Sequence, residues 1–325
     1  MSTANPSHDY NIACIPADGI GPEVIDAGVA VLQTLAETTG TFKLSFTHYD
    51  WSSETFRRTG KYIPDGGLER LRKHDAIFFG AVGDPGMFLF LFLFLFLFLF
   101  LCICFCFLFL CVGNGLIYQP DRSNFATPTR ERENRFCGNN AKCNCTIDIP
   151  DHISLWGLRL AICQPFQQYA NVRPTKILKG TESPLRNVKA GDLDWVIVRE
   201  NSEGEYAGQG GRSHRGMPWE VATDVSIFTR HAVERIMRFA FEIARGRPRK
   251  LLTVVTKSNA QRNGLVLWDE TAAAVAKDFP DVAVDKMLVD AMTCRMVLRP
   301  ESLDTIVATN LVFACRKRFF HGSKI

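Results

Sequence analysis

Hydrophobic residues near the N-terminus first form a continuous run and then recur with helical spacing. The apolar run YNIACIP at residues 10–16 leads into a glycine-rich turn. Pro22 then suits the first turn of a helix, where its missing N–H costs nothing. The next apolar residues recur every three or four positions, which predicts one buried helical face. They are Ile25, Val29, Leu32 and Leu35. The chain therefore begins with a strand, a turn and a helix.

The same alternation of apolar runs and amphipathic segments recurs along most of the chain. Residues 66–85 predict a short helix and then a buried strand from Ala76 to Val82. Further strands are predicted at 193–200, 250–259, 284–292 and 303–311, and helices at 229–248 and 265–279. Strands that alternate with helices favour an α/β fold with a largely parallel sheet.

One segment breaks this alternation, because residues 87–112 contain no charged residue. From Leu89 to Leu101 phenylalanine and leucine alternate strictly, so both faces are apolar and neither a strand face nor a helix face is specified. Phe and Leu codons can be TTT and CTT, and repeated TTTCTT tracts are usual in introns. We therefore interpret Met87 to about Ile149 as a low-complexity apolar insert, a retained intron read as coding sequence, outside the fold.

Other interpretations of this segment stay open. The run Met87–Val112 is long enough to span a bilayer. The chain would then be a single-pass membrane protein with a degenerate, non-catalytic α/β domain. A soluble core element and a gene-model artefact without a protein product are the remaining alternatives. Basic residues lie on both sides of the run, so the distribution of positive charge gives no orientation.

Composition and charge narrow the class of protein. The net charge of +4 is too small to indicate a nucleic-acid partner, and no basic stripe with interleaved aromatic residues is present. The N-terminus has no basic segment followed by an apolar run, so no secretory signal is predicted. Seven of the eleven cysteines lie in residues 102–145, and the other four are scattered as in reduced cytosolic proteins. We expect a cytoplasmic protein, with membrane attachment through Met87–Val112 as the alternative.

Ionisable side chains stand at the ends of several predicted strands, where open α/β sheets bind ligands. Arg173 and Arg199 suit bidentate binding of carboxylates. Tyr206 and Lys257 suit an acid–base pair. Asp290 suits a hard divalent cation, which prefers oxygen ligands. Each residue alone is more often a surface charge or a member of an ion pair, and only the set of five indicates an active site.

Two longer motifs carry a family resemblance. RENSEGEYAG at 199–208, together with QQYANVRP at 167–174, resembles the β-decarboxylating dehydrogenases of isopropylmalate, isocitrate and tartrate or D-malate. The resemblance is closest to the tartrate dehydrogenase/decarboxylase (D-malate dehydrogenase) branch. It covers Tyr10–Pro85 and Asp151–Leu311, and in the family GAVGDP runs almost directly into DHISLWG. The insert therefore interrupts an otherwise continuous match.

The resemblance implies an isopropylmalate dehydrogenase-like fold of two domains with a largely parallel central sheet. Residues 1–86 and 151–168 would form part of the first domain, and residues 169–311 the second, substrate-binding and dimerising part. Residues 312–325 would be an aberrant C-terminus, because the match stops at ATNL. The remaining C-terminal part of the fold is expected to be missing.

The resemblance also implies a reaction, the NAD-dependent oxidation and decarboxylation of a 2-hydroxydicarboxylate such as tartrate or D-malate. Arg173 and Arg199 would hold the substrate carboxylates. Lys257 would take the proton of the 2-hydroxyl as hydride passes to the nicotinamide, and Tyr206 would protonate the enol carbon. Asp290 would help to hold Mg²⁺ or Mn²⁺, which stabilises the enolate.

Further expectations concern the cofactor and the assembly. Asn259, Gly19 and Gly21 would lie near the nicotinamide. Lys257 and Asp290 would come from the partner subunit, which implies an obligate homodimer. The turn Asp18–Glu23 lacks the third glycine of a dinucleotide fingerprint, so this expectation comes from the resemblance alone.

The sequence departs from the family pattern at two places. The family usually has another substrate-binding arginine ten positions before Arg173, where this chain has Cys163, and Arg159 is a candidate replacement. Beyond ATNL the family continues with further metal-binding aspartates and an adenosine-binding loop. We therefore expect no measurable dehydrogenase activity from the chain as printed. The choice among tartrate, malate and isopropylmalate, and between NAD and NADP, stays open.

Overall fold

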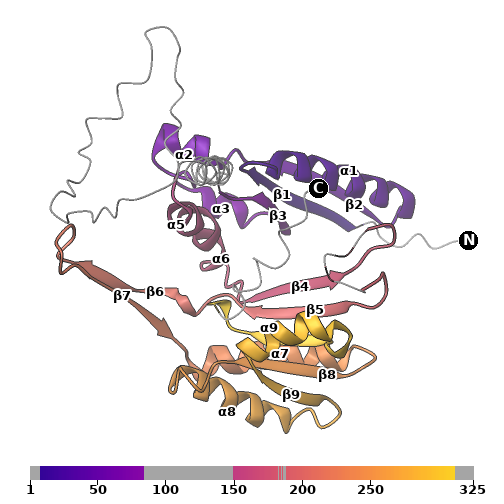
Figure 1. Cartoon of the computed structure of the whole chain (residues 1–325). Helices are drawn as coiled ribbons and strands as arrows, with labels where there is room; N and C mark the ends of the chain where they lie inside the picture. The colour runs from indigo at the N-terminus through magenta and orange to yellow at the C-terminus, as the bar shows by residue number, and fades with distance from the viewer. Residues whose placement is uncertain (1–7, 84–148, 182, 184, 186–187, 312–325) are drawn as a thin grey trace, which may run out of the picture. The chain divides into compact units, whose positions relative to one another are not determined.

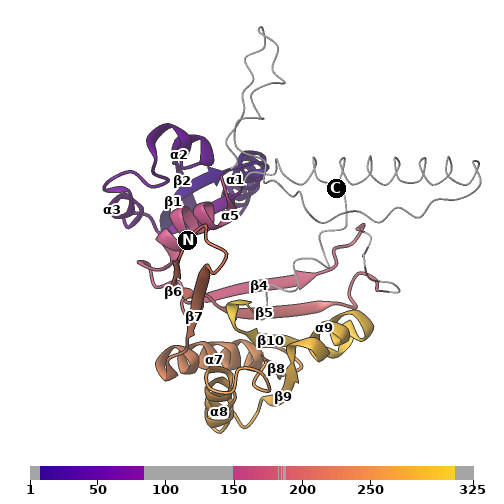
Figure 2. The ribbon, with the colours of Figure 1, turned by 60° about the vertical axis from the view of Figure 1, so that its left-hand side comes forward.

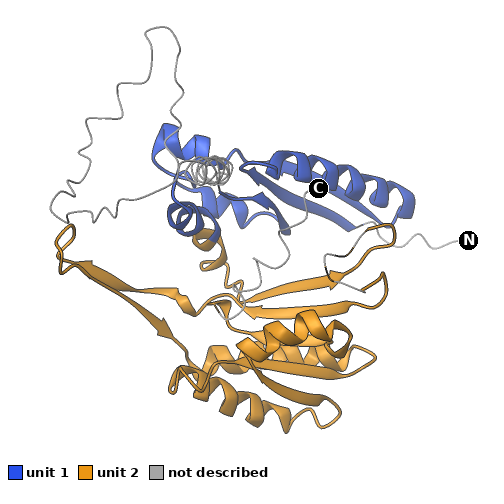
Figure 3. Ribbon diagram, viewed as in Figure 1, with its two compact units in different colours: residues 1–159 blue, residues 160–325 orange. Residues whose placement is uncertain are grey.

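The computed structural model describes residues 8–83, 149–181, 183, 185 and 188–311, and Figures 1 and 2 show their helices and strands from two directions. The apolar run Met87–Val112, nearly all of the proposed insert, and residues 312–325 lie outside the described residues. The described chain forms two compact units, residues 1–159 and 160–325 (Figure 3). The assignment of 1–86 and 151–168 to one domain and 169–311 to another stays a prediction.

The first unit contains a three-stranded parallel sheet in the order β2-β1-β3. Its strands are β1 (His8–Ala17), β2 (Phe42–His48) and β3 (Ala76–Ala81). The helix α1 (Gly21–Thr39) runs along this sheet (Figure 1). Shorter helices complete the unit: α2 (Ser53–Thr59), α3 (Gly67–Leu71), α5 (Asp151–Ser154) and most of the π-helical segment η2 (Leu155–Leu160). The predicted strand–turn–helix at the N-terminus is confirmed.

The buried face of α1 differs from the prediction at one residue. Ile25 is buried, and Val29 and Leu32 are half-buried, but Leu35 is 47% exposed. A helix with 3.6 residues per turn returns to the face of Ile25 and Leu32 at Ala36, which is half-buried, rather than at Leu35. Leu35 was therefore wrongly assigned to the buried face. The strand β3 is half-buried rather than buried, and it ends at Ala81.

The turn from β1 into α1 depends on close contact between backbones. A Cβ atom added to Gly21 would lie 1.9 Å from the carbonyl oxygen of Pro16. A Cβ atom on Gly80 of β3 would lie 2.2 Å from the same oxygen. Because real Cβ atoms do not approach backbone so closely, both positions require glycine for the helix and the neighbouring strand to pack against β1.

The second unit contains a five-stranded sheet in the order β4-β5-β10-β8-β9. The four strands β5, β10, β8 and β9 are parallel, and β4 at the edge is antiparallel to β5. This sheet confirms the predicted α/β fold with a largely parallel sheet. The strands are β4 (Ala170–Lys176), β5 (Asp194–Glu200), β8 (Leu251–Thr256), β9 (Ala283–Leu288) and β10 (Thr305–Ala308). The helical elements are α6 (Ala161–Cys163), α7 (Arg230–Arg245), α8 (Gly264–Ala276), α9 (Val289–Leu298) and η3 (Pro300–Ser302).

Helices cover both faces of the five-stranded sheet. Alternate residues of its strands therefore pack into two separate hydrophobic cores, one on each face. Val198, Val254 and Val307 pack with residues of α7 and α8. Their neighbours in sequence pack on the opposite face with Met292 and Met296 of α9, and these neighbours are Ile197, Val255, Ile306 and Ala308. Successive side chains of a strand point to opposite faces. The central strands are therefore buried on both sides, as expected for parallel sheets.

The strand predicted at 284–292 is shorter than expected. β9 ends at Leu288, which pairs with Thr256, the last residue of β8. No partner strand continues beyond that pair, so the chain turns into α9 at Val289. Asp290 consequently lies in the first turn of a helix, at the carboxyl end of the sheet, rather than in a strand.

A two-stranded antiparallel ribbon extends from the second unit (Figure 1) and consists of β6 (Gly204–Ser213) and β7 (Val221–Ile227). Several of its apolar side chains are exposed, namely Met217 and Trp219 at its turn and Val221, Val225 and Ile227 along β7. An isolated two-stranded ribbon is marginally stable in water. Among the described helices, none is both long enough and apolar enough to cross a membrane.

Candidate active site

The first cluster of predicted site residues lies where the antiparallel edge strand pairs with β5. Asn171 of β4 lies directly opposite Arg199 of β5. The Nε of Arg173 donates a hydrogen bond to the Oδ1 of Asn171 over 2.8 Å. Residues two apart on a strand, and residues opposite each other across a ladder, share one face of the sheet. Both predicted substrate-binding arginines therefore stand on one face, with Asn171 between them.

Tyr206 joins this cluster through Arg199. The Nη2 of Arg199 donates a hydrogen bond to the phenol oxygen of Tyr206 over 2.5 Å. The guanidinium carbon lies 5.2 Å from the centroid of the Tyr206 ring, within the range of cation–π attraction. Arg199 is only 3% exposed, and its Nε has no hydrogen-bond partner among the described residues. A buried cation with an unused donor is suited to bind an anionic ligand.

The turn between β5 and β6 is held by Glu200, whose side chain is buried. Its carboxylate accepts hydrogen bonds from the backbone N–H groups of Ser202 and Glu203, each over 2.9 Å. On the other side of the turn, the Nε2 of Gln164 donates to the backbone carbonyl of Tyr206 over 2.9 Å. These contacts fix the path of the chain from Arg199 to Tyr206.

The second cluster consists of Lys257 and Asp290. Lys257 directly follows β8, Asp290 follows β9, and their side chains form an ion pair. The side chain of Asp290 is 69% exposed and that of Lys257 is 30% exposed. Asn259, predicted to lie near the nicotinamide, is exposed in the turn after Lys257. The carboxyl ends of parallel strands meet at one edge of a sheet, so both clusters belong to the same edge.

The structure does not bring the two predicted proton-transfer groups into contact within one chain. The phenol of Tyr206 contacts Arg199, and the ammonium group of Lys257 contacts Asp290. The strand β10 lies between β5, which carries Arg199, and β8, which precedes Lys257. Arg173, Arg199 and Tyr206 thus form one group, and Lys257 and Asp290 form another.

The described residues of a single chain do not complete a metal site. Asp290 offers carboxylate oxygens of the kind that Mg²⁺ and Mn²⁺ prefer. However, no group of three or more His, Cys, Asp and Glu side chains suited to one ion occurs in the described part of the chain. Asp290 is therefore a suitable kind of ligand for the metal ion, but the described residues of one chain supply too few ligands to hold it.

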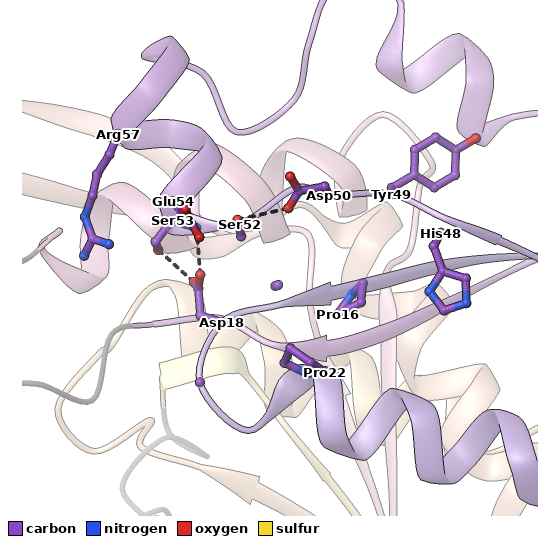
Figure 4. A pocket seen from close by; sticks show the side chains of 12 residues that line it. Pro16, Asp18, Pro22, His48, Tyr49, Asp50, Ser52, Ser53, Glu54 and Arg57 are labelled. Carbon is purple, nitrogen blue, oxygen red and sulfur yellow. Dashed lines mark hydrogen bonds between the residues drawn. The ribbon is translucent and has the colours of Figure 1, made fainter.

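The first unit contains a cavity of about 590 Å³ beside the turn between β1 and α1 (Figure 4). It lies at the carboxyl ends of β1 and β2, and its walls include Gly19 and the segment from Ser52 to Glu54. Gly19 has a φ of 57°, in the left-handed region that favours glycine. Gly21 does not line the cavity, and its contact with Pro16 gives it a packing role.

Asp18 at the edge of this cavity links three segments of the first unit. Its carboxylate accepts hydrogen bonds from the N–H of Ser53 over 2.7 Å and from its hydroxyl over 2.8 Å, and Figure 4 shows these contacts. It also accepts from the N–H of Gly83 over 3.1 Å. Asp18 therefore holds the ends of β1 and β3 to the start of α2.

Three of the residues that complete this geometry were not predicted from the sequence. Asn171, Gln164 and Asn310 are amides, and they act through other side chains or through backbone carbonyls. Their only signal was their place in the sequence, since Asn171 belongs to QQYANVRP, Asn310 belongs to ATNL, and Gln164 lies three residues before QQYANVRP. Cys163, where the family pattern has an arginine, ends α6 as a half-buried free thiol. Arg159 lies in the first unit.

Comparison with known proteins relates this arrangement to one family. The family model for isocitrate/isopropylmalate dehydrogenase matches residues 11–89 and 143–312. A probable tartrate dehydrogenase/decarboxylase of Agrobacterium vitis is 54% identical over 93% of this chain and 67% of its own length. The D-malate dehydrogenase [decarboxylating] of Escherichia coli (strain K12) is 38% identical over 92% of this chain and 66% of its own length.

Comparison with solved structures relates the chain to the same family. A solved isocitrate dehydrogenase from Methylococcus capsulatus superposes with a TM-score of 0.66 at 26% identity, over 96% of this chain and 70% of that one. The chain spans about two thirds of the length of the curated relatives that it matches. The family match covers both the strand–turn–helix at the N-terminus and all five strands of the second sheet. The chain therefore belongs to the isocitrate/isopropylmalate dehydrogenase family, whose members are enzymes.

Proposed function

We propose that the site residues of this protein serve the NAD-dependent, Mg²⁺- or Mn²⁺-dependent oxidation and decarboxylation of a 2-hydroxydicarboxylate such as tartrate or D-malate. The observation that carries the proposal is the cluster of Arg173, Arg199 and Tyr206 on one face of the sheet edge. The names of the two relatives, a tartrate dehydrogenase/decarboxylase and a D-malate dehydrogenase, support the class of substrate.

The arginines would bind the two carboxylates of the substrate. Arg173 is half-buried and Arg199 is buried, so both would form charge-assisted hydrogen bonds in a site of reduced dielectric. The unused Nε of Arg199 supports this role, because a carboxylate can accept from it while Tyr206 keeps the Nη2 hydrogen bond.

The proton transfers would be divided between the two clusters. Lys257, in its neutral amine form, would take the proton of the 2-hydroxyl, and NAD, when bound, would supply the hydride acceptor for the carbon that carries this hydroxyl. Tyr206 would donate a proton to the carbon that loses CO₂, with Arg199 keeping its hydroxyl in place. Each group is held by a charged neighbour, which fixes its orientation before substrate binds.

The two clusters would meet in a homodimer. Because β10 separates them in one chain, Lys257 and Asp290 of one protomer are proposed to complete the site that holds Tyr206 of its partner. The exposed apolar residues of the ribbon β6–β7 support the presence of a partner chain. Asp290 would supply one carboxylate to the metal ion, and the described residues of one chain support no further step through that ion.

The cavity beside Gly19 is proposed to hold part of the nicotinamide cofactor. Its place at the carboxyl ends of parallel strands is typical of ligand sites in open α/β sheets. The left-handed glycine allows close approach to the backbone of the turn.

Calorimetric titration of the chain with D-malate and with tartrate tests the substrate site directly. Replacing Arg173 with alanine should weaken binding about 10- to 100-fold, because hydrogen bonds to charged groups contribute about 1.5–3 kcal/mol. The matched control is Arg299→Ala, an exposed arginine at the end of α9 and away from the ribbon. Equal affinity in all three proteins would contradict the proposed substrate site.

Turnover is measured separately on the same sample. The chain as printed is predicted to form no measurable NADH from either acid. Mn²⁺-dependent NADH formation would contradict that prediction and would support the proposed reaction.

A further inference from the structure

Asn310 stands at the centre of the sheet edge that carries both clusters. It lies two residues beyond β10, the strand between β5 and β8, and is only 1% exposed. Its side-chain Nδ2 donates a hydrogen bond to the backbone carbonyl oxygen of Glu203. A carbonyl oxygen can only accept, so this contact requires the amide nitrogen of Asn310 to face it.

The same carbonyl oxygen is also the partner of Tyr206. The backbone N–H of Tyr206 donates to the oxygen of Glu203 over 3.3 Å. The two donors thus share one acceptor, and moving the Glu203 carbonyl would move Tyr206. Gly204 between them has a φ of 67°, and a Cβ atom there would lie 3.1 Å from the Nδ2 of Asn310. The turn therefore passes directly against the amide.

The other groups of this turn are held by different residues. The N–H of Glu203 donates to Glu200. The carboxylate of Glu203 accepts from the N–H and the hydroxyl of Thr229, each over 2.7 Å, at the start of α7. Gln164 holds the carbonyl of Tyr206. Among the described contacts, Asn310 is the side chain that fixes the direction of the Glu203 carbonyl itself.

We propose that Asn310 is a positioning residue that holds Tyr206 against Arg199 through the carbonyl of Glu203. An amide is needed, because a carboxylate of the same shape would place an oxygen against the carbonyl oxygen and could not donate. The catalytic meaning of this contact rests on the proposed function, in which Tyr206 transfers a proton. The position of the phenol itself can be measured without substrate or turnover.

The test uses nuclear magnetic resonance of the full chain labelled with ¹³C at the Cζ of tyrosine. The chain has six tyrosines, and Tyr206→Phe assigns the signal of interest. In Asn310→Ala this signal should shift or broaden, whereas those of Tyr49 and Tyr62 in the first unit should stay unchanged. The matched control is Thr305→Val, which alters a fully buried residue of β10 without touching the turn.

A second variant separates positioning from a general structural effect. In Asn310→Asp the ionised carboxylate cannot donate, so the Tyr206 signal should resemble that of the alanine variant at neutral pH. Burial raises the pKa of a carboxyl, so lowering the pH should protonate the aspartate and restore a donor. The signal should then return toward its wild-type position, while the wild-type signal is followed over the same range as a reference.

Two results would overturn the proposal. One is an unchanged Tyr206 signal in the folded alanine variant. The other is an aspartate variant whose signal does not respond to protonation, and this result decides the matter even where the alanine variant fails to fold. Neither measurement uses substrate. The proposed function, which is tested by substrate binding to Arg173→Ala, can therefore fail while this inference holds, and the two failures are distinguishable.

Discussion

At the scale of single residues, the hydrogen bond between Arg199 and Tyr206 is the contact with the clearest energetic consequence. Arg199 is 3% exposed, so removing the hydroxyl leaves one of its donors without a partner in a buried position. Tyr206→Phe should therefore lower the free energy of unfolding by about 1–2 kcal/mol, measured by urea denaturation. Tyr10→Phe, at a more exposed tyrosine, is the control and should change it by less than about 0.5 kcal/mol. Equal effects at the two positions would contradict a buried Arg199–Tyr206 hydrogen bond.

The chemistry of a site residue decides whether the sequence can predict it. Arg199, Lys257 and Asp290 stand at or just beyond the ends of strands, and such ends can be located from hydrophobic patterns, whereas Arg173 and Tyr206 lie within β4 and β6. The amides of Asn171, Gln164 and Asn310 carry no charge, and two of them bind backbone carbonyls. The sequence gives no direction for a backbone carbonyl. These three positions therefore needed the structure, and the roles of the five charged or phenolic residues stay predictions.

At the scale of elements, an ion-paired triad ties β5 to β10 and gives the fold an acid-sensitive contact. The side chain of Arg247 contacts Asp194 at the start of β5 and Asp304 just before β10. Burial acts to raise the pKa of Asp194, but its hydrogen bonds with Lys176 and Arg247 outweigh burial, and the net pKa is lower than usual. A carboxyl whose pKa is lower in the folded state stabilises the fold above its unfolded pKa of about 3.9. That contribution is lost as the pH falls through the lower, folded value.

Asp194→Asn should therefore be less stable than the wild type near neutral pH, and the difference should shrink as the pH falls below about 4. Urea denaturation midpoints at a series of pH values measure this. Asp26→Asn, on the exposed side of α1, is the control and should follow the wild type. A difference that grows toward acid pH would show that the sign of the pKa shift is wrong.

The junction of β1 and α1 gives a second prediction at this scale. In Gly21→Ala the new methyl group would meet the Pro16 carbonyl at 1.9 Å and the Ala81 N–H nitrogen at 2.9 Å. Both are backbone atoms, so the helix must move away from the sheet. The free energy of unfolding should fall by at least about 2 kcal/mol, measured by urea denaturation. Gly211→Ala, where a Cβ atom meets nothing within 4 Å, should change it by less than about 0.5 kcal/mol.

Element boundaries were predicted less well than element types, for two separate reasons. The strand at 284–292 was too long, because its end is set by the length of its partner β8, and pairing of distant strands is not encoded locally. Leu35 was placed on the buried face of α1 because its spacing from Leu32 fits a helix. A spacing of three followed by three drifts away from a face that repeats every 3.6 residues. Long periodic segments thus predicted whether an element is a helix or a strand, whereas pairing with distant strands determines where the element ends.

At the scale of the whole molecule, the gap in the family match coincides with the proposed insert. The match ends at residue 89 and resumes at residue 143, so most of residues 87–149 has no counterpart in the family model. The mature transcript is therefore expected to lack this tract and to join the codons near Pro85 and Asp151. Sequencing that transcript tests the interpretation. A mature message that carries the tract in frame would contradict the retained intron and leave the membrane alternative open.

The assembly gives the last prediction, and it concerns the apolar face of β7. Val221, Val225 and Ile227 point to the same side because they are separated by two or four residues, and all three are exposed. An apolar strand face of this kind is stabilised by a partner, and in the proposed homodimer the partner is the ribbon of a second protomer. Val225→Lys would place a charge in that contact. Sedimentation should then show a monomer where the wild type is a dimer.

The neighbouring residue provides the matched control, because Ala222→Lys adds the same charge on the other face of the same strand. That variant should stay dimeric. Because Lys257 and Asp290 are proposed to serve the site of the partner, monomerisation by Val225→Lys should also weaken any binding of Mn²⁺ that depends on Asp290. A wild-type chain that sediments as a monomer at all concentrations would require both clusters to act within one chain, which the position of β10 between them opposes.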